Sequence, residues 1–175
     1  GISMGAGIST NFTLRHPDRV QKLILHRPAW LDKPLPEYLK MVYEMACLIE
    51  ENGIEIARNE IVKTPLFQKM KSIAPEAVAV IWEQWQNPLA GEFYPLIKHI
   101  PNDSPFKKME DLKKIACPTL VIGTEKDPIH PIHFAEILAK ELPNGEFVKT
   151  APRYVEPVRH QMEVLDNIQR FLDKG

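Results

Sequence analysis

The 175-residue sequence has little cysteine, no long apolar run and almost no excess of charge. Cys47 and Cys117 are its only cysteines, too few for a disulfide framework, so we expect buried free thiols and a reducing, cytoplasmic setting. No apolar run approaches the ~20 residues of a membrane-spanning helix, and no charged segment precedes an apolar one as in a signal peptide. The net charge is −1, with both signs interspersed. We therefore expect binding to neither nucleic acid nor membranes.

Serine and glycine are sparse too, and the way they combine is informative. Of the four serines, only Ser3 has a glycine two residues away on each side, in Gly1-Ile2-Ser3-Met4-Gly5. A G-x-S-x-G run places a serine at the tip of a strained strand-to-helix turn, where the chain passes too closely for a Cβ. The alternative is a surface serine in a flexible segment, because short motifs recur by chance. The context must decide between them.

Both ends of the chain alternate between strand and helix patterns. Continuous apolar runs predict strands buried on both faces, and apolar residues at helical spacing predict helices. An alternation of this kind is typical of a parallel sheet with flanking helices, the α/β class. The predicted strands are 20–26, 119–123 and a short one at Phe147-Val148; the predicted helices are 8–14, 131–142 and 158–172.

The middle of the chain has a different character. From residue 31 to 115 the sequence shows helical periodicity interrupted by prolines and no strand pattern, which predicts a helical insertion. We expect a first core segment at 1–30, a helical cap at 31–115 and a second core segment at 116–175. The predicted helices of the insertion are 36–51, 54–63, 65–73, 75–86, 92–99 and 109–115.

Ser3, Asp127 and His160 follow one another in an order that, with the surrounding motifs, resembles an α/β-hydrolase from the nucleophile turn to the C-terminus. The matching segments are GISMGAG, RHPDRVQKLIL and CPTLVIGTEKDPIHP. The resemblance covers the whole chain, with residues 31–115 in the place of the family's helical cap. It implies Ser3 as the nucleophile, a histidine as its base and Asp127 as the carboxylate that orients the histidine. For Asp127 the alternative is a turn-capping residue before Pro128.

The choice of histidine is less direct. Tyr154 stands near the family's usual position, but a phenol with a pKa near 10 is no base at neutral pH. We predict His160, whose alternative is an exposed residue in the first turn of the last helix. His130 and His133 have a His-x-x-His spacing that suits a metal, and His130 is also a candidate for a supporting residue near the site. For both, a surface or loop position is the competing interpretation.

The resemblance also implies an oxyanion hole. The Met4 N–H is one candidate donor, and the second would come from a loop after an early strand that this sequence does not contain. Trp82 and Trp85 share a helix face and are either cap core or a wall of the substrate pocket. The strand at 20–26 is expected to leave an unpaired edge, covered by a companion chain, a swapped dimer or a missing N-terminal half.

The sequence therefore predicts a serine hydrolase that cleaves a small ester or related carbonyl compound through an acyl-enzyme, with no metal or organic cofactor. Acyl transfer, carbon–carbon bond hydrolysis and perhydrolysis remain open. The alternative is a non-catalytic fragment or degenerate family member that acts as a binding or interaction module.

Overall fold

A computed structural model describes residues 1–174 and divides the chain into two compact units. One unit contains residues 1–34 and the chain from residue 104 onward, and the other contains residues 35–103. The second boundary thus lies at 103 and not at the predicted 115. The reason is packing, because Phe106, Leu112 and Ile115 are buried in the core of the first unit.

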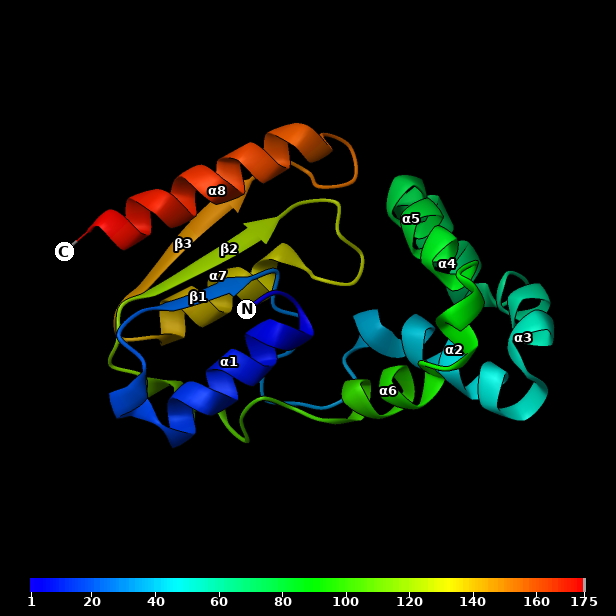
Figure 1. Cartoon of the computed structure of the whole chain (residues 1–175), viewed down its shortest axis with the longest axis horizontal. Coiled ribbons are helices and arrows are strands. Elements are labelled where there is room, and N and C mark those ends of the chain that lie inside the picture. Colours follow the sequence, from blue (N-terminus) through cyan, green and yellow to red (C-terminus); the bar gives the residue numbers. More distant parts are fainter. Residues whose placement is uncertain (175) are drawn as a thin grey trace. The chain divides into compact units, whose positions relative to one another are not determined.

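The first unit is built on a parallel sheet with the strand order β1-β2-β3. The strands are β1 (Leu23–His26), β2 (Thr119–Thr124) and β3 (Gly145–Thr150), and their arrows point the same way in Figure 1. Every residue of β2 is buried, as expected for a central strand with neighbours at both edges and helices over both faces. The predicted α/β class with a parallel sheet is confirmed.

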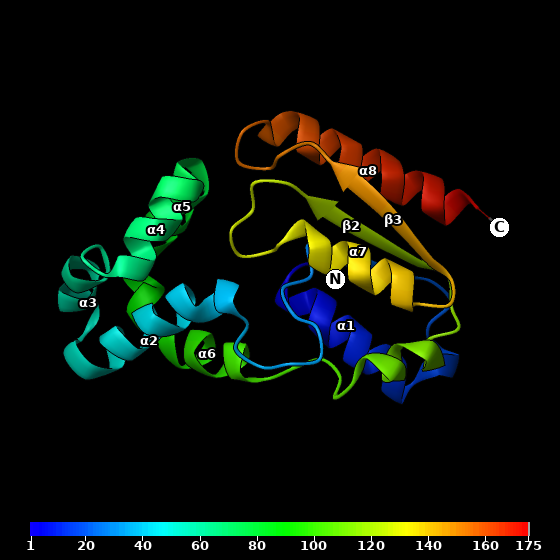
Figure 2. The same ribbon diagram turned by 180° about the vertical axis from the view of Figure 1, so that it is seen from behind.

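Helices cover the two faces of the sheet. In Figures 1 and 2, α8 (Pro157–Asp173) lies on one side of the strands, and α1 (Met4–Arg15) and α7 (Ile132–Glu141) lie on the other. Successive residues of β2 serve opposite faces, since strand side chains alternate. Val121 packs in the cluster on the α7 side, whereas Leu120 and Ile122 pack with Val164 and Phe171 of α8.

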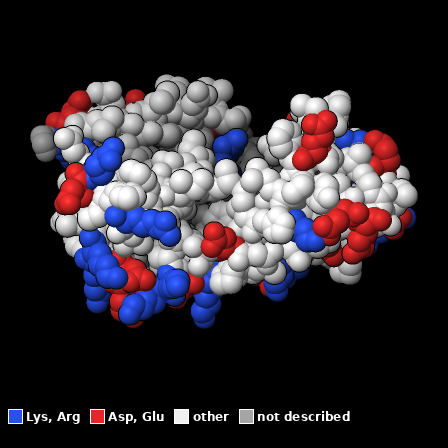
Figure 3. All heavy atoms as spheres, turned by 60° about the horizontal axis from the view of Figure 1, so that its bottom comes forward, with Lys and Arg blue, Asp and Glu red and all other residues white. Residues whose placement is uncertain are grey.

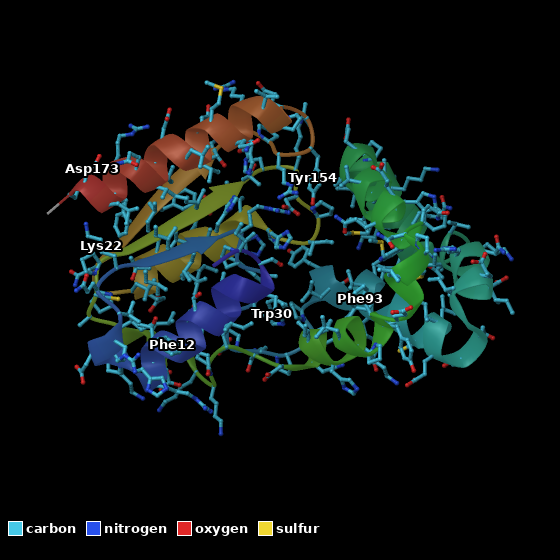
Figure 4. All side chains as sticks on the ribbon, viewed as in Figure 1. Phe12, Lys22, Trp30, Phe93, Tyr154 and Asp173 are labelled. Carbon is cyan, nitrogen blue, oxygen red and sulfur yellow. The ribbon has the colours of Figure 1, made fainter. Side chains whose placement is uncertain are left out.

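Short 3₁₀ segments complete this unit, namely η1 (Pro17–Arg19) and η5 (Met109–Lys114). The predicted α-helix at 109–115 is therefore a 3₁₀ segment. Lys22, which lies just before β1, caps the C-terminal end of α8. Figure 4 labels Lys22 and Asp173 on the same side of the sheet unit. Its Nζ donates to the carbonyls of Phe171 at 3.1 Å, of Leu172 at 2.8 Å and of Lys174. A cation at a helix C-terminus satisfies carbonyls that have no partner within the helix.

The second unit is helical throughout, and residues 35–103, all of which are described, contain no strand. Proline occupies the first position of α4 and α5, where its missing N–H costs no helical hydrogen bond. Gly53, at φ 77°, separates α2 from α3. The elements are η2 (Glu37–Leu39), α2 (Lys40–Asn52), α3 (Ile54–Ile61), α4 (Pro65–Ile73), α5 (Pro75–Trp85), η3 (Pro88–Gly91), α6 (Tyr94–His99) and η4 (Ile100–Asn102).

The surface agrees with the even charge balance of the sequence. Basic and acidic side chains adjoin one another on the face drawn in Figure 3. Cys47 and Cys117 are free thiols. Within residues 1–174, no helix combines the length and the apolar character needed to cross a bilayer.

Candidate active site

Ser3 occupies a strained turn between the edge of the sheet and α1. Its φ is 51°, in a region that residues other than glycine rarely adopt, and its N–H donates to the carbonyl of His26 at 3.0 Å. A Cβ added to Gly1 would collide with the carbonyl of Gly5 and lie 2.6 Å from Ser9 Oγ. A Cβ at Gly5 would meet nothing within 4 Å. Close approach therefore explains the first glycine of the motif and not the second.

The same turn covers part of the sheet edge. Ile2 bridges His26 in parallel, the Gly1 ammonium group donates to the carbonyl of Ile24, and the N–H of His26 donates to the carbonyl of Gly1. The expectation of a wholly unpaired edge along 20–26 is therefore wrong for Ile24–His26. The first residues of the chain satisfy those backbone groups.

Asp127 and His130 both lie in the turn that joins β2 to α7. Asp127 Oδ1 accepts the N–H groups of Ile129 at 3.2 Å and of His130 at 3.1 Å, so this residue does cap its turn. The same carboxylate also lies 3.0 Å from His130 Nδ1 through either oxygen. The turn-capping and the functional interpretations of Asp127 are therefore compatible.

His130 also reaches Ser3. Its Nε2 is 2.8 Å from Ser3 Oγ, which completes a hydrogen-bonded series from the hydroxyl through the imidazole to the carboxylate. Both Asp127 and His130 are buried. With the proton on Nδ1, facing Asp127, the lone pair of Nε2 can accept the Ser3 proton.

His160 does not take part in this series, and the expectation that it contacts Ser3 is not met. It lies in the first turn of α8, where its Nδ1 is 2.9 Å from the carbonyl of Ala151 and 3.1 Å from Thr150 Oγ1. Its ring is buried and stacks on that of His26. The last helix thus holds His160 against the end of β3, while the β2–α7 turn supplies the histidine at Ser3.

A family model described as the alpha/beta hydrolase fold matches residues 1–154. The chain belongs to the α/β-hydrolase fold family. No curated protein sequence matches the chain closely.

Solved structures agree with the hydrolase fold. A thermophilic esterase from Thermogutta terrifontis superimposes with a TM-score of 0.67 at 21% identity, covering 99% of this chain and 63% of the esterase. The enol-lactonase from Burkholderia xenovorans LB400 gives 0.68 at 15% identity, covering 99% and 64%. MenH from S. aureus gives 0.64 at 21% identity, covering 99% and 66%. This chain therefore spans just under two thirds of the length of these relatives.

Arg27 contacts both Asp127 and His130, and Tyr154 contacts Arg27. Arg27, directly after β1, donates from Nε to Asp127 Oδ2 at 2.7 Å, and its Nη2 lies 2.6 Å from the same oxygen. Nη2 also donates to the hydroxyl of Tyr154 at 3.0 Å. Figure 4 shows Tyr154 in the loop between β3 and α8. In the sequence, Tyr154 stood out only as the residue near the family's usual histidine position, and no motif marks Arg27.

Arg27 repeats the backbone strain of Ser3. Its φ is 52°, and it is the residue that immediately follows β1. Left-handed conformations of residues other than glycine cost on the order of 1–3 kcal/mol each, and they persist where the surrounding contacts over-determine them. Two such residues therefore meet at the carboxyl end of the sheet, where α/β folds place their sites.

Burial and the two flanking charges set the protonation of this cluster. Burial alone would raise the pKa of Asp127, but the hydrogen bond from His130 and the charge of Arg27 bring it down to about 2. Burial lowers the pKa of His130, and the contact with Asp127 offsets this only in part. Asp127 is therefore ionised and His130 is uncharged at neutral pH, which suits a base.

The remaining predicted residues have mixed outcomes. Met4 is the first residue of α1, where a backbone N–H has no acceptor within the helix, as an oxyanion donor requires. No group of three or more potential metal ligands occurs in residues 1–174, and both ring nitrogens of His130 already face Asp127 and Ser3.

Trp82 and Trp85 belong to an aromatic cluster of the helical unit. Trp82 packs edge-on against Phe67 at 6.0 Å and against Trp85 at 6.3 Å, measured between ring centroids. Trp85 is buried and Trp82 is half-buried. Burial favours the core interpretation for Trp85, and a pocket role for Trp82 stays a prediction.

Proposed function

We propose that this chain carries the catalytic residues of a serine hydrolase that cleaves an ester or related carbonyl compound through an acyl-enzyme. Ser3 is the nucleophile, His130 the general base and Asp127 the carboxylate that orients it. The single observation that carries the proposal is the 2.8 Å contact between Ser3 Oγ and His130 Nε2, with Asp127 on the opposite ring nitrogen. A serine hydroxyl is a weak nucleophile unless a base placed in this way removes its proton.

The reaction would proceed in two balanced halves. Ser3 Oγ bonds to the carbonyl carbon while its proton passes to His130 Nε2, and His130 returns that proton to the leaving alkoxide as the C–O bond breaks. Water then attacks the acyl group, gives its proton to Nε2, and Ser3 Oγ leaves and is reprotonated. Asp127 stabilises the imidazolium in both halves, and the Met4 N–H donates to the oxyanion.

The relatives support an ester-like substrate class. Two of the solved structures reported above are described as a thermophilic esterase and an enol-lactonase, and both substrates contain an acyl C–O bond. The choice between hydrolysis and acyl transfer depends on which nucleophile reaches the acyl group in the second half. We propose hydrolysis as the simplest outcome, because water needs no binding site of its own.

A fluorophosphonate probe tests the proposal. It should label Ser3 in the unsubstituted sequence, called the parent chain below, and should label no residue in Ser3→Ala. His130→Gln should slow labelling by about 10²–10⁴-fold, the usual contribution of a general base. His160→Gln, matched in residue type and burial, should label at close to the parent rate. Equal loss in the two histidine variants, both folded by circular dichroism, would contradict the assignment of His130.

The second candidate function is a binding or interaction module without catalysis. It is favoured by one observation, that the chain spans only 63–66% of the three relatives described above. A folded parent chain that resists the probe would support this candidate.

We also propose that further protein of the same fold covers part of the first unit. Val158, Met162, Leu165 and Leu172 of α8 are 50–71% exposed, although the same helix buries Val164 and Phe171 against the sheet. Ile8 and Phe12 of α1 are 59% and 45% exposed. The two groups lie on opposite faces of the sheet, and exposed large apolar side chains gathered on one helix are typical of an interaction surface. The occupant we propose is the portion of the hydrolase fold by which the relatives exceed this chain, on the same polypeptide or on a companion.

A further inference from the structure

Arg27 is the buried charged group of the site to which the reaction above gives no role. Its side chain is 5% exposed, and its guanidinium contacts Asp127 Oδ2 through two nitrogens, at 2.7 and 2.6 Å. His130 Nδ1 lies 3.0 Å from the same oxygen. The carboxylate of Asp127 therefore contacts both the permanently charged guanidinium and the imidazole ring.

The carboxylate is fully supplied with donors. Four N–H groups hydrogen-bond to it, from Ile129 N, His130 N, His130 Nδ1 and Arg27 Nε, and Arg27 Nη2 adds an ion-pair contact. An ionised carboxylate offers about four lone-pair sites. Arg27 makes the shortest of these contacts and is always charged. The hydrogen bond between Asp127 and His130 is therefore weaker than it would be if Arg27 were absent.

Arg27 also opposes a charge on the ring directly. Its Nη2 lies 3.0 Å from His130 Nδ1, and a guanidinium nitrogen can only donate. When the ring is neutral with its proton on Nδ1, two donors stand at that distance, and Asp127 is the acceptor for the Nδ1 proton. When the ring becomes an imidazolium, two full positive charges stand at that distance.

We propose that Arg27 is a positioning residue that fixes Asp127 against the imidazole and keeps His130 uncharged before the attack, so that Nε2 stays ready for the Ser3 proton at mildly acidic pH. Tyr154 holds the guanidinium in place by accepting from Nη2. The assignment deepens the proposed function and rests on it for the role of Ser3. The contacts among Arg27, Asp127 and His130 stand independently of that role.

The charged and titratable groups around His130 also favour the uncharged ring. They come from four places: Ser3 at the start of α1, His26 and Arg27 at the end of β1, Asp127 in the turn of His130 itself, and Arg153 and Tyr154 in the β3–α8 loop. Asp127 is the one anion among them, and Arg27 and Arg153 are two cations. Burial lowers the pKa of His130, and the charges of the two arginines lower it further.

An NMR titration of the His130 ring tests the proposal without any need for turnover. The full chain is compared in a Ser3→Ala background with Arg27 intact, with Arg27→Met and with Arg27→Lys. Arg27→Met removes the charge and retains much of the stem, so the His130 midpoint should rise by roughly one pH unit or more. Arg27→Lys retains the charge and should stay within a few tenths of the parent. A midpoint in Arg27→Met that equals or falls below the parent value overturns the proposal.

Two further measurements keep the test decisive. If Arg27→Met does not fold, Arg27→Gln replaces it, and the parent chain alone must still titrate His130 below its ordinary value of about 6.5. A parent midpoint at or above that value overturns the proposal. A chain that shows the expected midpoints and resists the fluorophosphonate probe refutes the hydrolase and leaves the role of Arg27 toward His130 intact. A chain that reacts with the probe but whose His130 midpoint is the same in Arg27→Met as in the parent supports the hydrolase and refutes the role of Arg27.

Discussion

The rings of His26 and His160 stack at 5.3 Å between centroids, with 27° between their planes. Both side chains are buried, and within residues 1–174 neither Nε2 atom has a hydrogen-bond partner. His160 is held by Ala151 through its other ring nitrogen. A proton added to either ring would create a charge beside Arg27 and out of reach of bulk water, so this pair resists protonation in the folded chain.

Acidification should therefore destabilise the folded chain. Burial, and then the charge of Arg27, lower the pKa of His26 to about 3, whereas an unfolded histidine titrates near 6.5. Between these values the unfolded chain binds the proton and the folded chain does not, so stability is lost as pH falls below about 6.5. We expect His26 alone to lower the free energy of unfolding by about 2 kcal/mol between pH 7 and pH 5.

Urea denaturation at the two pH values measures this loss. His26→Phe, which keeps an aromatic ring without a titrating group, should flatten the pH dependence. His99→Gln, at an exposed position of the helical unit, should leave it unchanged. A parent chain equally stable at pH 5 and pH 7 would contradict the interpretation of the stacked pair.

The two glycines of the Ser3 turn should respond differently to alanine. Gly1→Ala should displace the turn, because its Cβ would collide with Gly5 and crowd Ser9. We expect at least a tenfold loss of probe labelling at Ser3. Gly5→Ala, in the first turn of α1 with open space around it, should retain labelling and gain up to about 1 kcal/mol of stability. The opposite order of effects would show that the turn owes its conformation to something other than this close approach.

Alanine substitutions at Trp85 and at Trp82 should have different effects. Trp85 is 7% exposed, so Trp85→Ala should lower the free energy of unfolding by about 3 kcal/mol through loss of packing. Trp82→Ala should cost less, and if Trp82 lines the substrate pocket it should change the ratio of rates on short and long esters. Denaturation curves and a series of nitrophenyl esters measure the two effects. An unchanged ester ratio would restrict Trp82 to the core of the helical unit.

The exposed apolar face of α8 should make the isolated chain self-associate. Met162→Lys combined with Leu165→Lys should raise the monomer fraction in sedimentation velocity, because two charges on that face oppose its burial. Ser72→Lys, at an exposed position of the helical unit, is the control for added charge and should change little. A parent chain that is monomeric at high concentration would argue against the proposed covering protein.

Much of the fold could be predicted because the signals are local. The apolar run of β2 and the proline that begins α4 and α5 each determine their elements over a few residues. The boundary of the helical unit was misplaced because residues 109–115 have a helical pattern in the sequence, whereas only the folded chain shows that Phe106 and Leu112 pack in the core of the first unit.

The site was predicted in part for the same reason. Two residues of the proposed site, Ser3 and Asp127, were predicted because a motif and a strand end mark them. His130 was assigned to other roles, although Asp127-Pro128-Ile129-His130 is one short turn in which residues three apart can meet. Arg27 had no sequence signal at all, since its position at Asp127 comes from the pairing of β1 with β2 across 100 residues of chain.

The β2–α7 turn has one more consequence. Asp127 and His130 are separated by two residues, so their distance is set by a single turn and does not depend on how the last helix docks. In the arrangement that the family resemblance suggested, the histidine would come from the other side of β3, and the acid and base would meet only after the sheet and the last helix had assembled. Here Asp127 and His130 both belong to one turn, and only the Ser3 hydroxyl is supplied by another element of the fold.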